Sequence, residues 1–318
     1  MSYAVEAHGV RKQYGSLVAV GDLTFVAEPG EILGVLGPNG AGKTTAIRVL
    51  TTILAPTRGT FSVAGAPHTR PGEIRRRIGV LPESAGYPER QTGEEYLRYH
   101  ARLFGHSRSS AGAVAGVLLE EVGLTERRRS LIASYSRGMR QRLGIARALV
   151  NEPRVVFLDE PTLGLDPAGQ RQVLALVRRM AKERGATVLL STHLLTEVEE
   201  TCSRVLILNR GRVATEGTVP EVAGLAAAPR TVRLRVGADD VQRALEALSV
   251  ATGVESAVPA DGPPGTLVVT MGSIDGRPGE ELLNASLRAM VDGSIPLLSY
   301  ELEGARLSDA FLAMTEAA

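Results

Sequence analysis

A glycine-rich loop between a short apolar stretch and a helical stretch limits most strongly how this chain can fold. Residues 31–36 have the pattern of a buried strand, and residues 37–44 follow with the sequence GPNGAGKT. Residues 45–54 then show a helical pattern that Pro56 ends. A strand, G-x-x-x-x-G-K-[ST] and a helix, in this order, are the context that a phosphate loop requires. The sequence therefore predicts an α/β fold built around a phosphate-binding loop.

The residue types in this loop suit a triphosphate. Glycines let the backbone approach phosphate oxygens and turn its N–H groups toward them, and the helix behind adds its positive dipole end. Only three of the 36 basic residues are lysines, and one of them, Lys43, stands in this loop, where a compact ammonium can reach the β and γ phosphates. The alternative is a tight turn without a ligand, which the flanking strand and helix disfavour. The predicted binding residues are Gly37, Pro38, Asn39, Gly40, Ala41, Gly42, Lys43, Thr44 and Thr45.

Two adjacent carboxylates follow a second apolar run. Residues 155–158 read VVFL, which is typical of a central parallel strand, and Asp159 and Glu160 come next. Open α/β sheets bind ligands at the carboxyl ends of their strands. We expect Asp159 to hold Mg²⁺ and Glu160 to orient or deprotonate an attacking water. A solvated acidic turn would be the better interpretation of this pair alone, but the phosphate loop favours the functional one.

A histidine ends a third predicted strand. Residues 186–191 form an apolar run, and His193 is the one of the five histidines that follows such a strand. Its side chain is in a position to hydrogen-bond a γ-phosphate. A histidine at such a place is as often purely structural, so its assignment as a catalytic residue rests on the neighbouring motifs.

Taken together, these motifs resemble the ATP-binding cassette (ABC) family. Residues 37–45 match its Walker A loop, 155–161 its Walker B strand, and His193 its switch histidine. The remaining matches are Tyr14, which resembles the aromatic residue that stacks on adenine, the signature YSRGM at 135–139, and the D-loop GLDP at 164–167. The motifs occur in the family's order between residue 3 and about residue 225. The resemblance implies an ATPase that uses ATP and Mg²⁺ and powers a membrane transporter.

The resemblance also implies an architecture and partners. Residues 1–228 would form the ATP-binding domain, with a RecA-like core, an antiparallel β subdomain and a helical subdomain at about 84–150 that contacts the membrane partner. That partner would be a separately encoded polytopic permease, and the chain would lie peripherally at the cytoplasmic face of the cell membrane. A second ATP-binding subunit, most simply another copy, would place its Ser136 and Gly138 on the bound ATP. Tyr87, Pro88 and Tyr96 are candidate contacts for a coupling helix of the permease, and the alternative is that the two tyrosines belong to the local core.

Two positions depart from the family pattern. The signature has Arg137 where the family commonly has glycine, but it keeps Ser136 and Gly138, so we expect its phosphate contact to persist. Glu83, in Val-Leu-Pro-Glu, replaces the usual glutamine and adds a negative charge near the γ-phosphate. We therefore expect Thr44, Glu83 and Asp159 to form the metal site, with a stronger dependence on Mg²⁺ than glutamine would confer.

Composition excludes several other classes. A net charge of +1 does not predict binding to nucleic acid, and the single Cys202 cannot form an internal disulfide. No apolar run approaches the roughly 20 residues that span a bilayer, and the opening residues lack a leader pattern. Two rival functions remain: a soluble ABC-type ATPase that acts on nucleic acid or ribosomes, and a regulatory module that binds nucleotide without hydrolysing it. The single cassette and single cysteine count against the first, and Glu160 with His193 counts against the second.

A second domain is predicted over residues 229–318. Its strands and helices alternate in the order βαββαβ, followed by a last helix, which suggests a small α+β domain of the ferredoxin-like type. It resembles the accessory C-terminal domain of ATPases from drug and antibiotic exporters, including the daunorubicin-resistance type. The resemblance implies export, together with a regulatory or dimer-stabilising role for this domain.

Overall fold

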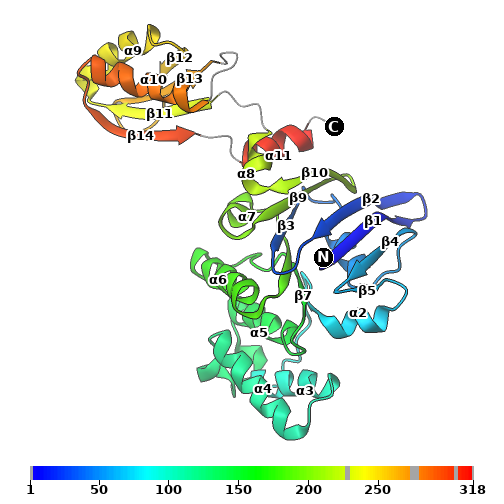
Figure 1. Cartoon of the computed structure of the whole chain (residues 1–318). Coiled ribbons are helices and arrows are strands. Elements are labelled where there is room, and N and C mark those ends of the chain that lie inside the picture. Colours follow the sequence, from blue (N-terminus) through cyan, green and yellow to red (C-terminus); the bar gives the residue numbers. More distant parts are fainter. Residues whose placement is uncertain (1–2, 226–229, 273–278, 304–306, 317–318) are drawn as a thin grey trace. The chain divides into compact units, whose positions relative to one another are not determined.

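A computed structural model describes residues 3–225, 230–272, 279–303 and 307–316 of the chain (Figure 1). The chain divides into two compact units. The first holds Met1–Val222 with Met314–Ala318, and the second holds Ala223–Ala313. The sequence-based boundary after residue 228 stays a prediction.

The first unit is built on a ten-stranded sheet in the order β5-β4-β1-β2-β10-β9-β3-β8-β7-β6. Its strands are β1 (Val5–Tyr14), β2 (Leu17–Ala27), β3 (Ile32–Leu36), β4 (Arg58–Val63), β5 (Ala66–Pro67), β6 (Ile78–Leu81), β7 (Val155–Asp159), β8 (Thr187–Ser191), β9 (Arg204–Asn209) and β10 (Arg212–Thr218). The β1, β2, β4 and β5 strands pair antiparallel, whereas β9, β3, β8, β7 and β6 pair parallel. These are the antiparallel subdomain and the parallel core expected from the sequence.

The parallel strands explain why the predicted motifs meet. Every residue of β3, β7 and β8 is buried, as expected for apolar strands covered on both faces. In register, Leu81 lies beside Leu158, and Ser191 lies between Asp159 and Val35. The carboxyl ends of four strands are therefore aligned at one edge, and each predicted motif begins just beyond its strand.

Helices surround this core and form a separate helical part. They are α1 (Lys43–Leu50), α2 (Pro71–Arg77), α3 (Gly93–Leu103), α4 (Arg108–Glu121), α5 (Arg137–Ala148), α6 (Pro167–Arg184), α7 (Leu195–Thr201) and α8 (Val219–Gly224), with 3-10 turns at Thr125–Arg127 and Ile132–Ser134. Local sequence sets several helix starts. Thr92 and Glu95 form a capping box at α3, and the Asp166 side chain accepts from Gly169 N at the start of α6.

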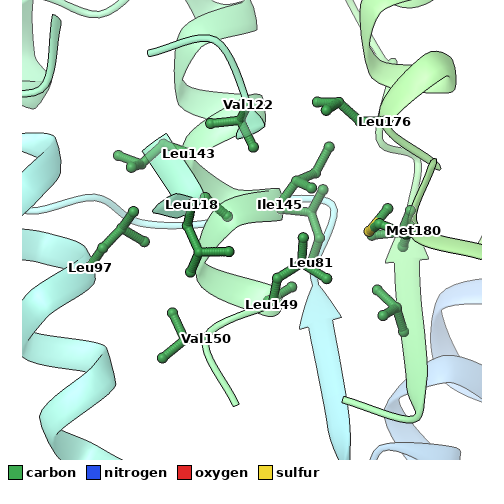
Figure 2. Packing of buried hydrophobic residues seen from close by; sticks show 14 of the residues in the cluster. Leu81, Leu97, Leu118, Val122, Leu143, Ile145, Leu149, Val150, Leu176 and Met180 are labelled. Carbon is green, nitrogen blue, oxygen red and sulfur yellow. The ribbon is translucent and has the colours of Figure 1, made fainter. Parts of the chain in front are cut away.

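A continuous apolar cluster holds the helical part on the core. Figure 2 shows Leu97 and Leu118 beside Leu143 and Ile145 of α5, with Leu81 of β6 close by. Leu143 is completely buried, and truncating such a leucine to alanine typically costs about 2–5 kcal/mol. This packing fixes α5, and with it the signature motif at its start, against the parallel sheet.

Tyr87 and Tyr96, which the sequence left as either permease contacts or core residues, pack with this cluster. Tyr96 is 4% exposed and lies in the same cluster. Tyr87 is partly buried against the cluster, and its hydroxyl donates to Arg140 O at 2.8 Å. A Cβ on Gly144 would lie 2.5 Å from that hydroxyl, so only glycine there lets Tyr87 reach α5. The structure favours the local-core interpretation for both tyrosines.

The second unit has its own sheet and core. Its elements are β11 (Arg230–Val236), a 3-10 turn at Ala238–Asp240, α9 (Val241–Ser249), β12 (Val254–Pro259), β13 (Thr266–Met271), α10 (Gly279–Asp292) and β14 (Leu297–Glu303). The last helix, α11 (Leu307–Glu316), begins in the second unit and ends in residues assigned to the first. The four strands form an antiparallel sheet in the order β12-β13-β11-β14. Val232 and Leu234 of β11 are buried in one cluster with Leu248 of α9. The element order is the one predicted, and the ferredoxin-like assignment stays a prediction.

Among the helices that the structure describes, none is both long and apolar enough to cross a membrane.

Candidate nucleotide site

The phosphate loop connects β3 to α1, and its glycines are required by close contacts. Gly40 and Gly42 have φ angles of +81° and +103°, which favour glycine. A Cβ on Gly42 would lie 2.5 Å from Ala19 O, and one on Gly37 would lie 2.5 Å from Leu208 O. The loop therefore packs directly on the backbone of β2 and β9, which leaves no room for side chains at Gly37 and Gly42, whereas Gly40 is favoured by its positive φ alone.

Lys43 lies at the centre of the loop with 7% of its surface exposed. Its Nζ donates to Gly37 O at 2.7 Å and to Pro38 O at 3.3 Å, and it lies 3.9 Å from Glu160 Oε1. Burial lowers the pKa of Lys43, while the negative charge of Glu160 opposes that shift. The ammonium is thus held by loop carbonyls and faces the acidic pair at the end of β7.

Asp159 is 2% exposed, and its Oδ1 accepts from Thr44 Oγ1 at 3.3 Å. Burial raises the pKa of Asp159, and the hydrogen bond from Thr44 counteracts part of that rise. The structure therefore brings together two of the three predicted metal ligands. The third, Glu83, lies beyond β6 and is close enough for its charge to act on both Lys43 and Asp159.

Glu160 turns away from the strand direction at the end of β7. Its φ is +49°, an uncommon value for a residue other than glycine, and its N–H donates to Ser191 O at 2.9 Å. Glu160 as a whole is 8% exposed, and its Oε2 lies 2.8 Å from Nδ1 of His193. The His193 side chain is 42% exposed. The structure thus joins the two predicted catalytic residues directly.

Most of these residues line one cavity of about 510 Å³, although Gly37, Pro38 and Asp159 are not part of its lining. It is lined by Leu17, Val18, Ala19, Asn39, Gly40, Ala41, Gly42, Lys43, Thr44, Thr45, Glu83, Glu160, Leu163 and His193. Sequence reasoning missed Leu17, Val18, Ala19 and Leu163, which bear no polar side chain that could have marked them. Leu17, Val18 and Ala19 come from the start of β2 and give this part of the lining an apolar surface.

The other predicted contacts lie outside that lining. Tyr14, the last residue of β1, is 45% exposed, and Lys12 Nζ lies 5.1 Å from its ring centroid. Ser136 caps α5 by accepting from Met139 N at 3.2 Å. Gly138 follows in the first turn of α5, and a Cβ on it would lie 3.8 Å from Leu165. The structure does not bring Ser136 or Gly138 to the cavity of their own chain.

The fold and this site define an ATP-binding cassette ATPase. Residues 20–163 match the model of the ABC transporter family. The chain is also 38% identical to the daunorubicin/doxorubicin resistance ATP-binding protein DrrA of Streptomyces peucetius, over 98% of this chain and 92% of that protein. The chain belongs to the ABC transporter family, as the resemblance predicted.

Further similarities agree with this assignment. The chain is 40% identical to the Nod factor export ATP-binding protein I of Paraburkholderia xenovorans, over 67% of this chain and 70% of that protein. A solved ATP-binding subunit of an ABC transporter superposes with a TM-score of 0.64 at 35% identity and covers 71% of this chain and 95% of the solved one. The predicted fold class of the ATP-binding domain and the predicted ATPase activity are both confirmed by these relationships.

Proposed function

We propose that this chain binds ATP with Mg²⁺ in the cavity at the end of the parallel strands and hydrolyses it to drive export through a separate membrane subunit. The observation that carries the proposal is the convergence of Lys43, the Thr44–Asp159 pair and the Glu160–His193 pair on one cavity. Relatives named for drug resistance and for Nod factor export support the direction of transport.

The donor set fits ATP and Mg²⁺. Mg²⁺ prefers oxygen ligands and usually keeps waters, so a hydroxyl and one or two carboxylates are sufficient protein ligands. Thr44, Asp159 and Glu83 supply them. Among the described residues, no group of three or more His, Cys, Asp or Glu side chains could hold a metal ion, which suits a cation completed by phosphate and water rather than a dedicated metal cage. When bound, Mg²⁺ neutralises phosphate charge and polarises the phosphoryl group.

The chain's own residues then divide the work. Backbone N–H groups of the loop and the Lys43 ammonium bind the phosphates. Glu160 accepts the proton of the attacking water. His193 holds Oε2 of Glu160, while Oε1 faces Lys43 at 3.9 Å, so the carboxylate is oriented from both sides. Tyr14 stacks on adenine at the apolar end of the site.

A second subunit completes the site. Ser136 and Gly138 lie at the N-terminus of α5, where a hydroxyl and free N–H groups favour an anion. Because neither residue lines the cavity of its own chain, both are available to the nucleotide of a partner. The simplest partner is a second copy of this chain, and ATP draws the two copies together.

The membrane subunit docks at a groove beside the helical part. A hollow of about 280 Å³ is lined by residues that include Ile53, His100, Phe104 and Arg147. Ile53 is 63% exposed and Phe104 is 44% exposed, so this part of the surface presents apolar side chains. A short helix of a polytopic permease, apolar on one face, suits this groove. The chain would then lie peripherally at the cytoplasmic face of the membrane.

The C-terminal unit, residues 229–318 in the sequence-based division, is an accessory domain that regulates or stabilises the dimer. Its separate core supports an independent role. The transported substrate is chosen by the membrane subunit.

Hydrolysis of ATP by the purified chain, with and without Mg²⁺, tests the proposal. A second arm isolates the chain from its native membrane and identifies what accompanies it. We expect Mg²⁺-dependent phosphate release and co-purification of a polytopic protein. Absence of turnover would support the regulatory alternative, whereas co-sedimentation with ribosomes or nucleic acid would support the soluble alternative.

A further inference from the structure

A buried carboxylate outside the nucleotide cavity contacts the segment that holds His193. Glu197, in the first turn of α7, is 4% exposed. Its Oε2 accepts a hydrogen bond from Thr192 Oγ1 at 2.9 Å, and its Oε1 has no partner in the structure. Thr192 is completely buried and directly precedes His193. None of the proposed steps of hydrolysis uses Glu197.

The Thr192 hydroxyl makes hydrogen bonds that span His193. It donates to Glu197 and accepts from Leu194 N at 3.1 Å. The Thr192 N–H in turn donates to Val35 O in β3 at 3.4 Å. The backbone on both sides of His193 is therefore tied through one hydroxyl, and the turn that presents the imidazole to Glu160 is fixed.

The helix that bears Glu197, α7, packs closely on β3. A Cβ on Gly34 of β3 would lie 3.0 Å from both Cys202 Sγ and Val198 Cγ1. Val198 is completely buried. Glycine at position 34 thus lets α7 pack directly on the strand that leads into the phosphate loop. Glu197 hence links the turn of His193 to a helix that packs on the strand leading into the phosphate loop.

We propose that Glu197 and Thr192 are positioning residues for His193 in ATP hydrolysis. The inference rests on the proposed function, because His193 must act on Glu160 and the nucleotide. Burial of a carboxylate costs free energy unless it is hydrogen-bonded, and the Thr192 hydroxyl supplies the hydrogen bond that Oε2 of Glu197 accepts. Loss of either partner lets the His193 turn relax, which weakens the 2.8 Å contact between His193 and Glu160.

The test compares Thr192→Val, which removes only the hydroxyl, with Thr192→Ser, which keeps it. We expect kcat of the full-length chain to fall about ten- to a hundredfold in Thr192→Val, since small misplacements of reacting groups have effects of this size. We expect KM for ATP to change little and Thr192→Ser to retain most activity. Glu197→Gln keeps an oxygen that can accept the hydrogen bond, so its kcat should lie between those of Thr192→Val and Thr192→Ser.

Thr201→Val is the matched control. Like Thr192, Thr201 is a buried threonine, but it lies at the end of α7. Its hydroxyl accepts a hydrogen bond from Arg178 at 3.3 Å, away from His193. Thr201→Val should lower the thermal stability about as much as Thr192→Val does, but it should leave kcat unchanged. A second readout uses the His193→Ala background, in which Thr192→Val should lower kcat no further.

Equal kcat in Thr192→Val and wild type would overturn the inference, as would an additive effect in the His193→Ala background. Both outcomes leave the proposed function standing, since wild-type hydrolysis is measured in the same assay. Failure of the wild type to hydrolyse ATP would instead reject the proposed function.

Discussion

The imidazole Nδ1 of His193 lies 2.8 Å from Oε2 of Glu160, although 33 positions separate the two residues in the chain. The contact exists because β7 and β8 are parallel neighbours that end together, with Asp159 beside Ser191. Glu160 reaches it by adopting a positive φ at the strand end. The carboxylate is thereby oriented by a contact within the protein itself.

Glu160→Gln should keep nucleotide binding and lose turnover. Glutamine retains the shape and an oxygen for His193, but it is not basic, and removal of a general base typically lowers the rate about 10²–10⁴-fold. Phosphate release and binding of a fluorescent ATP analogue measure the two effects separately. The same variant should accumulate the ATP-bound dimer. Glu200→Gln, at an exposed glutamate, serves as the control, and wild-type turnover in Glu160→Gln would refute the assignment of the base.

Lys43→Ala should weaken nucleotide binding itself. The change removes the ammonium that lies among Gly37 O, Pro38 O and Glu160, and charge-assisted hydrogen bonds contribute about 1.5–3 kcal/mol, so we expect Kd for ATP to rise by tenfold or more. Isothermal titration in the presence of Mg²⁺ measures it. Lys182→Ala removes an exposed lysine from the end of α6 and should leave Kd unchanged. Unchanged binding in Lys43→Ala would contradict the proposed loop.

Glu83→Gln should make hydrolysis less dependent on Mg²⁺. Glu83 lines the cavity and places a negative charge near Asp159, so the wild-type site requires a cation to offset it. ATPase rates over a Mg²⁺ titration at constant ATP measure the difference. Superimposable titrations of the two proteins would show that Glu83 has no part in the metal site.

His100→Phe should make the free energy of unfolding less dependent on pH below about pH 6.5. Burial, with the charge of Arg147 nearby, lowers the pKa of His100 from 6.5 to about 4. The unfolded chain therefore takes up a proton first as the pH falls, and the free energy of unfolding decreases between about pH 6.5 and pH 4. Because His100 is only partly buried, solvent screening keeps the loss well below the limit of about 1.4 kcal/mol per pH unit for one such group. Urea denaturation at pH 7.5 and pH 5 in both proteins measures this loss, and the same loss in both proteins would argue against a lowered pKa of His100.

Deletion of residues 230–318 should weaken dimer assembly or its control of hydrolysis. The deletion also removes Met314, whose carbonyl accepts from Asn209 Nδ2 of β9 at 3.0 Å. Asn209→Leu in the full-length chain therefore separates loss of that contact from loss of the domain. Sedimentation with ATP, the ATPase rate and transport are the readouts. If all three were the same as in the full-length chain, the accessory role would be rejected.

The polar part of the site was predictable because its residue types are chemically distinctive and follow apolar strands. Lys43, Asp159, Glu160 and His193 each stand just beyond a predicted strand or loop, and the parallel register brings them together. Element order in the second unit was predictable for a similar reason, since its strands alternate in burial, as in Val232 and Leu234.

The rest depended on three-dimensional contacts that leave no mark in the sequence. Leu17, Val18 and Ala19 line the cavity because Gly42 packs against Ala19 O, a contact between distant segments. The role of Tyr87 depends on a missing side chain at Gly144. Likewise, the Thr192–Glu197 pair joins residues of common types, and only their shared burial distinguishes them.

The hydrogen-bond partners of Lys43 have a consequence for how the phosphate site is assembled. Because the Gly37 and Pro38 carbonyls accept hydrogen bonds from the ammonium, the loop itself holds the cation that binds the phosphates. One short segment thus supplies both the backbone amide groups and the placed ammonium, and no other element is needed to position this cation.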